Sequence, residues 1–401
     1  MMLSAKSKPY IDASVPVLRA HGIAITTVFY QNMFAAHPEL KNIFNMGNQA
    51  NGSQQQSLAA AVFAYAANIE NSSALAPVVE RIVHKHVSVG IKAEHYPIVG
   101  KYLLGAIRQI LSDAATTELI DAWAEAYGLL ADALIAAEVK LYQQNNQQPD
   151  EWLKVKVLEK IHHTNDIASF ILQAENAATL PKFKAGQYIS VAVQLAELNL
   201  RQIRQYSLSN ATGESTYRIT VKRENADEYK PKGNVSNWLH QHARVGSLLE
   251  ISHPCGNFTP ELLSQKPIAL ISAGVGITPM LSIFDTLALS NPNRPVLFVH
   301  AARNQNHIAY FDEIQKTKSL LSNAKLAFFL DEYDETSTDK IKGRMNLNNL
   351  EIESYKEGVF YICGPQVFMD DQRDALLALG VSPNQIHREV FGPESLNHMV
   401  Q

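Results

Sequence analysis

Two histidines separated by one residue, His84 and His86, lie in a predicted helix and are candidates to hold a metal ion. Residues two positions apart on a helix point about 200° apart, so these two cannot face the same ligand. His86 continues the apolar face that includes Val79 and Val83, whereas His84 shares its face with Glu80. The spacing predicts that His86 is the buried histidine. It leaves open whether His86 ligates a metal or only bonds to a carbonyl in the core.

A carboxylate, Glu138, also falls on an apolar helix face. It continues the stripe of Trp123, Tyr127 and Leu134. A bare carboxylate is costly to bury, so it needs a hydrogen-bond donor. Because a metal-ligating histidine nearly always donates its other ring N–H to a carboxylate or a carbonyl, Glu138 is a candidate partner of His86. The alternative is a glutamate near a helix end that reaches into water.

Two further polar side chains lie in apolar helical stripes. Tyr30 lies between Thr27 and Phe34, and Gln54 is followed at helical spacing by Leu58. Two such hydrogen-bond donors over one cavity could stabilise a polar ligand on a metal ion. The alternatives are ordinary core packing for Tyr30 and a first-turn position facing solvent for Gln54.

The second half of the sequence contains segments suited to phosphates and flavins. The segment RQYS at a strand terminus brings together a guanidinium, an aromatic ring and a hydroxyl, which suit a pyrophosphate and a flavin ring. The segment GNVS leads into a helix, whose N-terminal N–H groups favour a phosphate, although a simple helix cap is the alternative for its serine. The candidate flavin-binding residues are Arg204, Gln205, Tyr206, Ser207, Gly233, Asn234, Val235 and Ser236, with Tyr188 before them.

A glycine turn follows an apolar strand predicted at Ile268 to Ile271. Proline replaces the third glycine of the usual dinucleotide fingerprint, but proline is favoured in the first turn of a helix, and the glycine pair still lets the chain turn beside a pyrophosphate. The segment CGP ends a later strand, at the edge where ligands bind in open α/β sheets, unless its cysteine is simply a small buried residue before a turn. The candidate nucleotide-binding residues are Gly274, Val275, Gly276, Ile277, Thr278, Pro279 and Cys363.

Three kinds of structure must position these side chains. From Tyr10 to Tyr142 apolar residues recur at helical spacing, which predicts an all-α region, and the polar segment from Gln143 to Glu151 marks its end. Short strands of period two, such as Tyr188 to Val193, predict an antiparallel β-barrel. Alternating strands and helices from Ile268 predict an α/β domain with a parallel sheet. The predicted domains are residues 1–147, 151–262 and 266–401.

Composition narrows the possible functions. The chain has 401 residues, a formal net charge of -4 and 2 cysteines. This length favours two or three domains. Without a basic field the chain is not expected to bind nucleic acid, and two cysteines, Cys255 and Cys363, are too few for a disulfide framework or a cysteine-ligated cluster. No segment resembles a signal peptide or a membrane span, so a cytoplasmic protein is expected.

The helical region resembles the globin domain of bacterial and yeast flavohemoglobins. The similarity is carried by Phe29-Tyr30, Met33-Phe34, the stretch from Pro38 to Met46, Asn48-Gln49 and Lys85-His86. It implies a heme b whose iron is ligated by His86, with Tyr96 and Glu138 in a hydrogen-bonded relay behind that histidine. An anionic partner of this kind favours O2 activation over reversible storage. The residues that the resemblance places on the heme face and in the distal pocket are Phe44, Tyr30, Gln54 and Leu58.

The rest of the chain resembles the FAD barrel and NAD(P) domain of ferredoxin–NADP reductase-like proteins. By this resemblance Cys363 lies near the nicotinamide, and Glu389 reaches toward the flavin and the heme edge alongside Lys85. The segment Phe391, Gly392 and Pro393 belongs to the cofactor-binding residues, with Phe391 covering the flavin ring until the nicotinamide displaces it. Simple core packing is the alternative for Phe391. The preference between NADH and NADPH stays open.

The resemblance implies a nitric oxide dioxygenase with heme b, FAD and NAD(P)H as cofactors. NAD(P)H gives a hydride to FAD, electrons pass singly to the heme, and O2 bound there oxidises nitric oxide to nitrate. The expected partners are these small molecules, the chain is expected to be a monomer, and lipid occupancy of the distal pocket stays open. Two other functions are considered. One is a heme-based gas carrier or sensor with its own reductase, and the other is a general flavin or alkyl hydroperoxide reductase.

Overall fold

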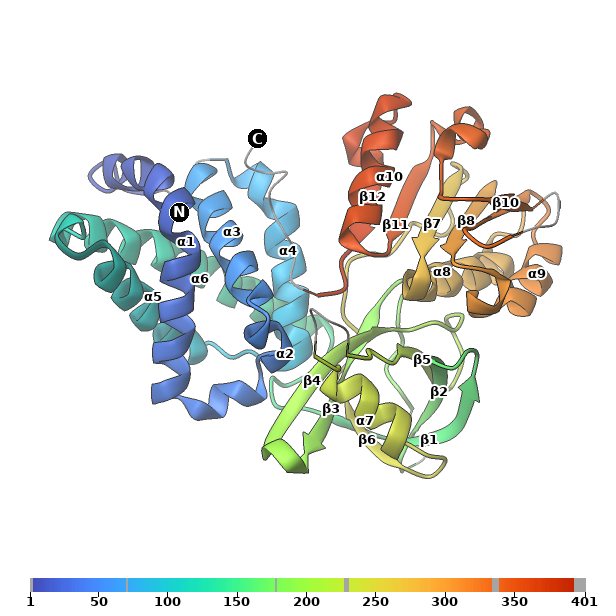
Figure 1. The fold of residues 1–401 in the computed structure, drawn as a ribbon, viewed down its shortest axis with the longest axis horizontal. Helices are drawn as coiled ribbons and strands as arrows, with labels where there is room; N and C mark the ends of the chain where they lie inside the picture. The colour runs from blue at the N-terminus through green and yellow to red at the C-terminus, as the bar shows by residue number, and fades with distance from the viewer. Residues whose placement is uncertain (1–2, 70, 177–178, 227–230, 334–338, 393–401) are drawn as a thin grey trace.

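The computed structural model describes residues 3–69, 71–176, 179–226, 231–333 and 339–392, which form three parts (Figure 1). The N-terminal part is helical, as predicted. Its longest helices, α1 and α6, form because apolar residues recur along one side of each, and α6 begins where the Thr116 side chain accepts a hydrogen bond from the backbone N–H of Leu119. The helices are α1 (Lys8–Ala36), η1 (Pro38–Asn42), α2 (Met46–Ala50), α3 (Ser53–Ala67), α4 (Ser72–Val89), α5 (His95–Leu111), η2 (Ser112–Ala114) and α6 (Thr117–Gln144).

The second part is a curled antiparallel sheet, which confirms the predicted barrel. Its strand order is β4-β3-β6-β1-β2-β5. The two outer strands approach each other through a bridge between Leu208 and Ile219, so the sheet nearly closes on itself around an apolar interior. The elements are β1 (Leu153–His162), β2 (Ile167–Ala174), β3 (Tyr188–Leu195), η3 (Ala196–Leu198), β4 (Leu200–Ser207), β5 (Tyr217–Lys222), α7 (Asn234–His242) and β6 (Leu248–Ile251).

The third part is a parallel sheet of order β10-β9-β8-β7-β11-β12 with helices packed on it, again as predicted. Strand order reverses between β7 and β11, and in open α/β sheets ligands bind at the carboxyl ends of the strands beside such a point. Its strands and longer helices are β7 (Ile268–Ala273), α8 (Ile277–Ser290), β8 (Val296–Ala302), α9 (Phe311–Ser319), β9 (Ala324–Leu330), β10 (Lys340–Lys342), β11 (Val359–Cys363), α10 (Gln366–Ala378) and β12 (Ile386–Glu389). The short 3-10 turns are η4 (Gly274–Gly276), η5 (Gln305–His307), η6 (Leu347–Asn349), η7 (Ile352–Tyr355) and η8 (Pro383–Gln385).

A buried amide forms several of the hydrogen bonds between the helical part and the barrel. Gln202 on β4 is 1% exposed and donates hydrogen bonds to the carbonyls of Lys41 and Phe44, at 2.8 and 3.3 Å. Its side-chain oxygen accepts a bond from the backbone N–H of Met46 at 3.2 Å. A buried amide that is fully paired fixes the position of the segment it bonds to. The loop between η1 and α2 is therefore held against the antiparallel sheet.

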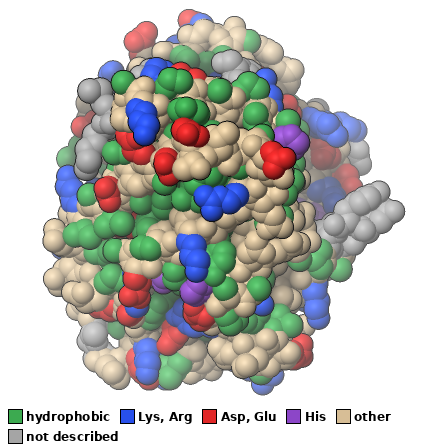
Figure 2. All heavy atoms as spheres, turned by 90° about the vertical axis from the view of Figure 1, so that its left-hand side faces the viewer, with side chains coloured by type: hydrophobic (Ala, Val, Ile, Leu, Met, Phe, Trp, Pro, Cys, Tyr) green, Lys and Arg blue, Asp and Glu red, His purple; other side chains and the backbone are tan. Residues whose placement is uncertain are grey.

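The outer surface fits the weak net charge. Acidic and basic side chains are interspersed over the exposed face of the helical part, with no field of a single sign (Figure 2). Among the described residues, none of the helices combines the length and the apolar character that a membrane span requires.

Candidate functional site

A histidine, a carboxylate and a tyrosine meet between α4, α5 and α6. His86 Nδ1 lies 2.7 Å from Glu138 Oε1 and 3.1 Å from the Tyr96 hydroxyl. Tyr96 also donates to the same carboxylate oxygen, at 2.5 Å. Glu138 is only 3% exposed, so the carboxylate obtains from these two donors the hydrogen bonds that burial would otherwise remove.

This arrangement orients the histidine ring. Burial and the neighbouring Glu138 carboxylate both raise the pKa of Tyr96, so its hydroxyl keeps its proton and acts as a donor. With Nδ1 of His86 held by Glu138, Nε2 is the ring nitrogen that can ligate a metal. The His86 side chain is still 34% exposed, although it lies on the inner face of α4. A histidine that has Nδ1 anchored and a side chain that is still partly exposed fits a residue that ligates a heme iron.

The opposite wall of the helical part carries a buried tyrosine hydroxyl. Tyr30 is 3% exposed, and burial raises the pKa of this phenol, while the neighbouring side chains of Gln54 and Gln49 act to lower it. Phe44 packs edge-on against the Tyr30 ring at 5.8 Å, and Leu58 packs against the same apolar core. These side chains are thus brought together, and the protonated phenol is a potential hydrogen-bond donor to a small ligand.

Gln49 was not among the predicted site residues. Its side-chain oxygen accepts a hydrogen bond from Gln55 at 3.0 Å. Among the described residues, the buried atoms Gln49 Nε2 and Gln55 Oε1 have no hydrogen-bond partner of good geometry. Unpaired buried amide atoms next to Tyr30 fit a pocket that receives a polar ligand. A polar residue on the short helix α2 gives no periodic signal, which is why the sequence pattern did not reveal it.

The prediction that His86, and not His84, is the buried histidine of α4 was wrong in one respect. His84 does lie on the other side of the helix from His86, but both side chains are half-buried. The reason is that the polar side of α4 faces the barrel: His84 Nδ1 accepts a hydrogen bond from the backbone N–H of Gly256 at 3.0 Å. Burial lowers the pKa of His84, in keeping with a neutral ring that accepts this bond.

The predicted flavin-binding residues surround the end of β4. Tyr188 on β3 is 7% exposed, and its hydroxyl is buried with no well-formed hydrogen bond among the described residues. The Arg204 guanidinium lies beside Gly47 of the helical part, and Gln205 donates to the Ser88 hydroxyl at 3.2 Å. Tyr206 follows with its ring partly buried, and Ser207 is buried at the strand end. An orphaned hydroxyl, a ring and a guanidinium at one strand end fit a flavin and its pyrophosphate.

The second flavin segment begins α7. Gly233 is its N-cap residue, and a side chain there would touch Glu224 and Ser236 at 2.8 Å. The Ser236 hydroxyl accepts from the backbone N–H of Glu224 and donates to the Gly233 carbonyl, while Val235 is buried and Asn234 starts the helix. Ser236 therefore closes the loop locally, and the N–H groups of the first turn are what this segment can offer to a phosphate.

The glycine turn presses against the cysteine segment. A Cβ at Gly276 would lie 2.2 Å from the Cys363 carbonyl oxygen, whereas nothing lies within 4 Å of one at Gly274, which has φ +55°. Gly276 therefore permits close contact between two strand ends, and Gly274 faces open space suited to a dinucleotide. Cys363 is fully buried, and burial raises its pKa far from the thiolate range. The other turn residues lie in η4 and the first turn of α8 and are Val275, Ile277, Thr278 and Pro279.

The C-terminal segment returns to α4. Lys85 Nζ donates to the Gly392 carbonyl at 2.7 Å, and Glu389 at the end of β12 is buried, with a carboxylate oxygen 3.2 Å from the N–H of Val390. Phe391 is 46% exposed, so simple core packing does not describe it. Pro393 was also predicted to bind a cofactor and lies outside the described residues.

Comparison with known proteins covers the whole chain. The Globin family matches residues 27–134, the Oxidoreductase FAD-binding domain residues 154–259, and the Oxidoreductase NAD-binding domain residues 270–374. The flavohemoprotein of Rhizobium meliloti (strain 1021) is 45% identical over 404 residues, covering 98% of this chain and 99% of the relative. That of Bacillus subtilis (strain 168) is 42% identical and covers 98% of each chain.

Solved structures agree with this similarity. The flavohemoglobin of Malassezia yamatoensis, with bound FAD and heme, superposes with a TM-score of 0.88 at 32% identity, covering 98% of this chain and 100% of that chain. The flavohem-like FAD/NAD binding domain of nitric oxide dioxygenase from Vibrio cholerae O1 biovar El Tor has a TM-score of 0.55 at 35% identity, covering 60% of this chain and 99% of that chain. The similarity to the first structure therefore includes all three parts.

The first prediction concerns His86. His86→Ala removes the ring nitrogen that faces open space, so the purified variant should contain much less heme while it keeps its FAD. The measurement is the ratio of heme to flavin absorbance per chain. His21→Ala, a change at an exposed histidine of α1, is the matched control and should keep both. Normal heme occupancy in His86→Ala would remove His86 from the site.

The second prediction separates the two nucleotide modules. Gly276→Val forces a side chain into the Cys363 carbonyl, so flavin reduction by NAD(P)H should slow by roughly tenfold or more, because a displacement of about 1 Å is enough for such a loss. FAD should stay bound, and dithionite should still reduce it. Arg204→Ala should instead lower FAD retention. Loss of FAD from Gly276→Val would contradict the assignment of the two modules.

Proposed function

This chain belongs to the flavohemoprotein family, and we propose that it acts as a nitric oxide dioxygenase that draws its electrons from NAD(P)H. Its FAD-binding and NAD-binding domains make it an oxidoreductase. In this proposal residues 1–147 hold a heme b, residues 151–262 hold FAD, and residues 266–401 bind NAD(P)H. The small molecules that it meets are O2, nitric oxide and NAD(P)H, and it works as a monomer in the cytoplasm.

The hydrogen bond between Glu138 and His86 is the observation that carries the proposal. It supplies a buried anion 2.7 Å from the nitrogen opposite the metal-facing one. Such a partner makes the histidine more basic and increases electron donation to a bound metal, which favours O2 activation over storage. Tyr96 bonds to the same oxygen and fixes the carboxylate. A protein that only carried gas would need no such buried and costly carboxylate.

The cofactors supply the redox chemistry when bound: hydride acceptance, single-electron transfer and the reaction of O2 with nitric oxide. The chain orients and protects them. His86 would hold the heme iron through Nε2, and Phe44 and Leu58 would shield the ligand pocket from water. Tyr30, with Gln54 beside it, donates a hydrogen bond to a polar ligand in that pocket, since burial keeps its hydroxyl protonated.

On the reductase side the chain sets the distance between donor and acceptor. Tyr188 and the RQYS segment orient the flavin ring, and Gly274 and Gly276 let the nicotinamide nucleotide approach beside Cys363. Lys85, the residue before His86 on α4, bonds that helix to the Gly392 carbonyl. In the proposal this contact and Glu389 lie between flavin and heme, so the helix that bears His86 also borders the flavin site.

The third prediction tests the distal pocket. Tyr30→Phe keeps the ring and deletes only the hydroxyl. A hydrogen bond to a ligand with partial negative charge is worth about 1.5–3 kcal/mol, so O2 should dissociate roughly ten to a hundred times faster, and nitric oxide consumption should fall when O2 is limiting. Stopped-flow O2 dissociation and nitric oxide turnover are the measurements.

The matched control uses an acceptor that does not enter the distal pocket. Ferricyanide reduction with NAD(P)H should be the same in Tyr30→Phe and in the wild type, because electrons then leave the flavin directly. An unchanged O2 dissociation rate together with unchanged nitric oxide turnover would contradict the distal role of Tyr30. Full NAD(P)H-dependent activity toward hydroperoxides in heme-free protein would favour the general-reductase alternative.

A further inference from the structure

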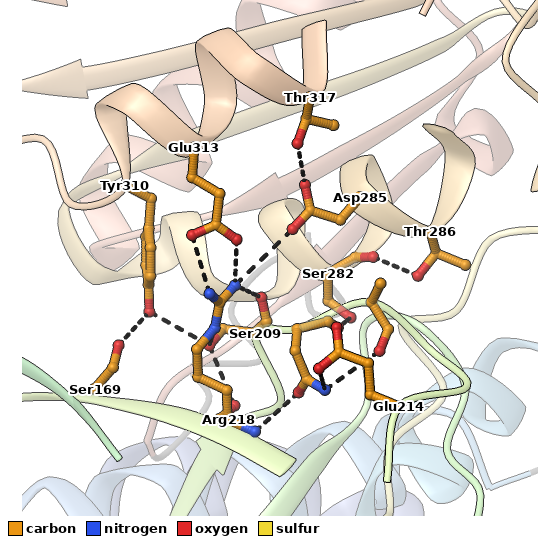
Figure 3. Close-up of polar contacts among 12 residues, drawn as sticks. Ser169, Ser209, Glu214, Arg218, Ser282, Asp285, Thr286, Tyr310, Glu313 and Thr317 are labelled. Carbon is orange, nitrogen blue, oxygen red and sulfur yellow. Dashed lines mark hydrogen bonds and ion pairs between the residues drawn. The ribbon is translucent and has the colours of Figure 1, made fainter. Parts of the chain in front are cut away.

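One guanidinium joins the barrel to two helices of the NAD-binding domain (Figure 3). Arg218 on β5 donates two hydrogen bonds to Glu313 on α9, at 3.0 and 2.8 Å, and forms an ion pair with Asp285 on α8 at 3.9 Å. It also bonds to the Ser209 carbonyl at 2.5 Å. The side chains of Arg218 and Asp285 are each 13% exposed. Paired charges that are this well shielded resist screening and have one favoured geometry.

A tyrosine crosses the same boundary from the other side. Tyr310 precedes α9, and its hydroxyl is within hydrogen-bond distance of Ser169, Ser209 and Thr220, all on the barrel side. Its backbone has φ +66°, a conformation that a tyrosine rarely adopts and that holds only where the surroundings enforce it. The Arg218 guanidinium lies 4.8 Å from the centre of its ring, which adds a cation–π contact.

Both helices held by this cluster begin at the nucleotide edge of the sheet. Helix α8 follows the glycine turn directly, and α9 follows the loop after β8. Two more bonds fix α8 to the segment after β4: Ser282 donates to the Asn210 carbonyl at 2.8 Å, and the N–H of Thr212 donates to the Thr286 hydroxyl at 3.1 Å. The barrel strand that carries Arg218 therefore determines where the nucleotide-binding turn lies relative to the barrel.

We propose that Arg218, Glu313 and Asp285 are positioning residues, which form an interdomain latch that holds the nicotinamide over the flavin for hydride transfer. The proposal rests on the NAD(P)H-to-FAD step of the proposed function. The step itself is balanced by the cofactors, as a hydride leaves the nicotinamide and joins the flavin. The latch touches neither reacting atom. It acts through α8 and α9, because a displacement of about 1 Å between donor and acceptor is enough to slow such a transfer by roughly a hundredfold.

The charges of the latch are unequal. One guanidinium faces two carboxylates, and Thr317 donates to Asp285 at 2.7 Å. Burial raises the pKa of Asp285 to about 7, and the neighbouring Glu313 carboxylate adds to this shift, while Arg218 opposes it. A histidine, His163, also faces the cluster: its ring packs on Tyr310 at 4.3 Å, and burial lowers its pKa to about 4. At neutral pH this ring is uncharged.

The fourth prediction is kinetic. Glu313→Gln and Arg218→Lys each break the two-pronged pair, since lysine keeps the charge but not the fork. Anaerobic flavin reduction by NADH should slow by roughly tenfold or more in both holoproteins, with FAD content and dithionite reduction unchanged. Glu351→Gln is the matched control, because Glu351 pairs with Lys325 inside the NAD-binding domain and at an exposed position. NADH should reduce the flavin of this variant at the wild-type rate.

The outcomes separate this proposal from the function on which it rests. Wild-type flavin that neither NADH nor NADPH reduces would contradict the proposed function itself. If NADH reduces the flavin in Glu313→Gln and in Arg218→Lys as fast as in the wild type, the latch is contradicted. If either variant loses FAD or fails to fold, Tyr310→Phe gives the same test with one hydroxyl removed. A normal reduction rate there, with FAD bound, would overturn the proposal.

The fifth prediction concerns pH. The pKa of Asp285 is higher in the folded protein than its ordinary value of 3.8, so the folded state binds the extra proton, and this contribution to stability is lost as pH rises from about 4 to about 7. Asp285→Asn cannot ionise and should flatten this part of the profile. Its melting temperature should exceed that of the wild type at pH 8, and the difference should disappear below about pH 4. Parallel pH profiles for the two proteins would show that Asp285 does not titrate in the latch.

Discussion

The burial of the Glu138 carboxylate is the constraint on which the helical site depends. A carboxylate that is 3% exposed must be bonded, and the two donors within reach are His86 and Tyr96. These two hydrogen bonds fix α4 and α5 against α6. They also occupy Nδ1 of His86, so Nε2 is the nitrogen left for a metal. Packing and chemistry thus arise from the same three side chains. A neutral residue at this position would relieve the cost of burial and leave His86 without orientation.

Helix α4 links this site to the reductase. Within five residues it bonds to Glu138 through His86, to Gly256 through His84, and to Gly392 through Lys85. Ser88, on the same turn, accepts from Gln205 of the RQYS segment. Because α4 contacts all three parts, this one helix connects the RQYS segment and the C-terminal segment to His86. At the other boundary, Arg218 bonds the barrel to Glu313 of α9 and forms an ion pair with Asp285 of α8.

The spacing of residues in the sequence predicted much of the fold and of the site. The remaining contacts form where parts of the chain that are distant in sequence pack together. The apolar faces of α4 and α6 predicted where His86 and Glu138 lie, and period-two strands and the glycine turn predicted a barrel followed by a parallel sheet. The roles of these residues remain predictions. What spacing did not reveal are pairs distant in sequence. Arg218 and Glu313 are 95 residues apart, and each occupies an ordinary polar position of its own strand or helix. Gln202 likewise looks like a polar strand residue until the helical part covers it.

The most direct measurement of the central claim is the product of the aerobic reaction of the purified holoprotein with NADH and nitric oxide. If the buried carboxylate and the attached reductase serve O2 activation, nitric oxide should disappear at a rate that depends on both NADH and O2, and nitrate should form in equal amount. NADH oxidation that nitric oxide does not change, with no nitrate formed, would contradict the claim and leave a gas carrier with its own reductase as the better description.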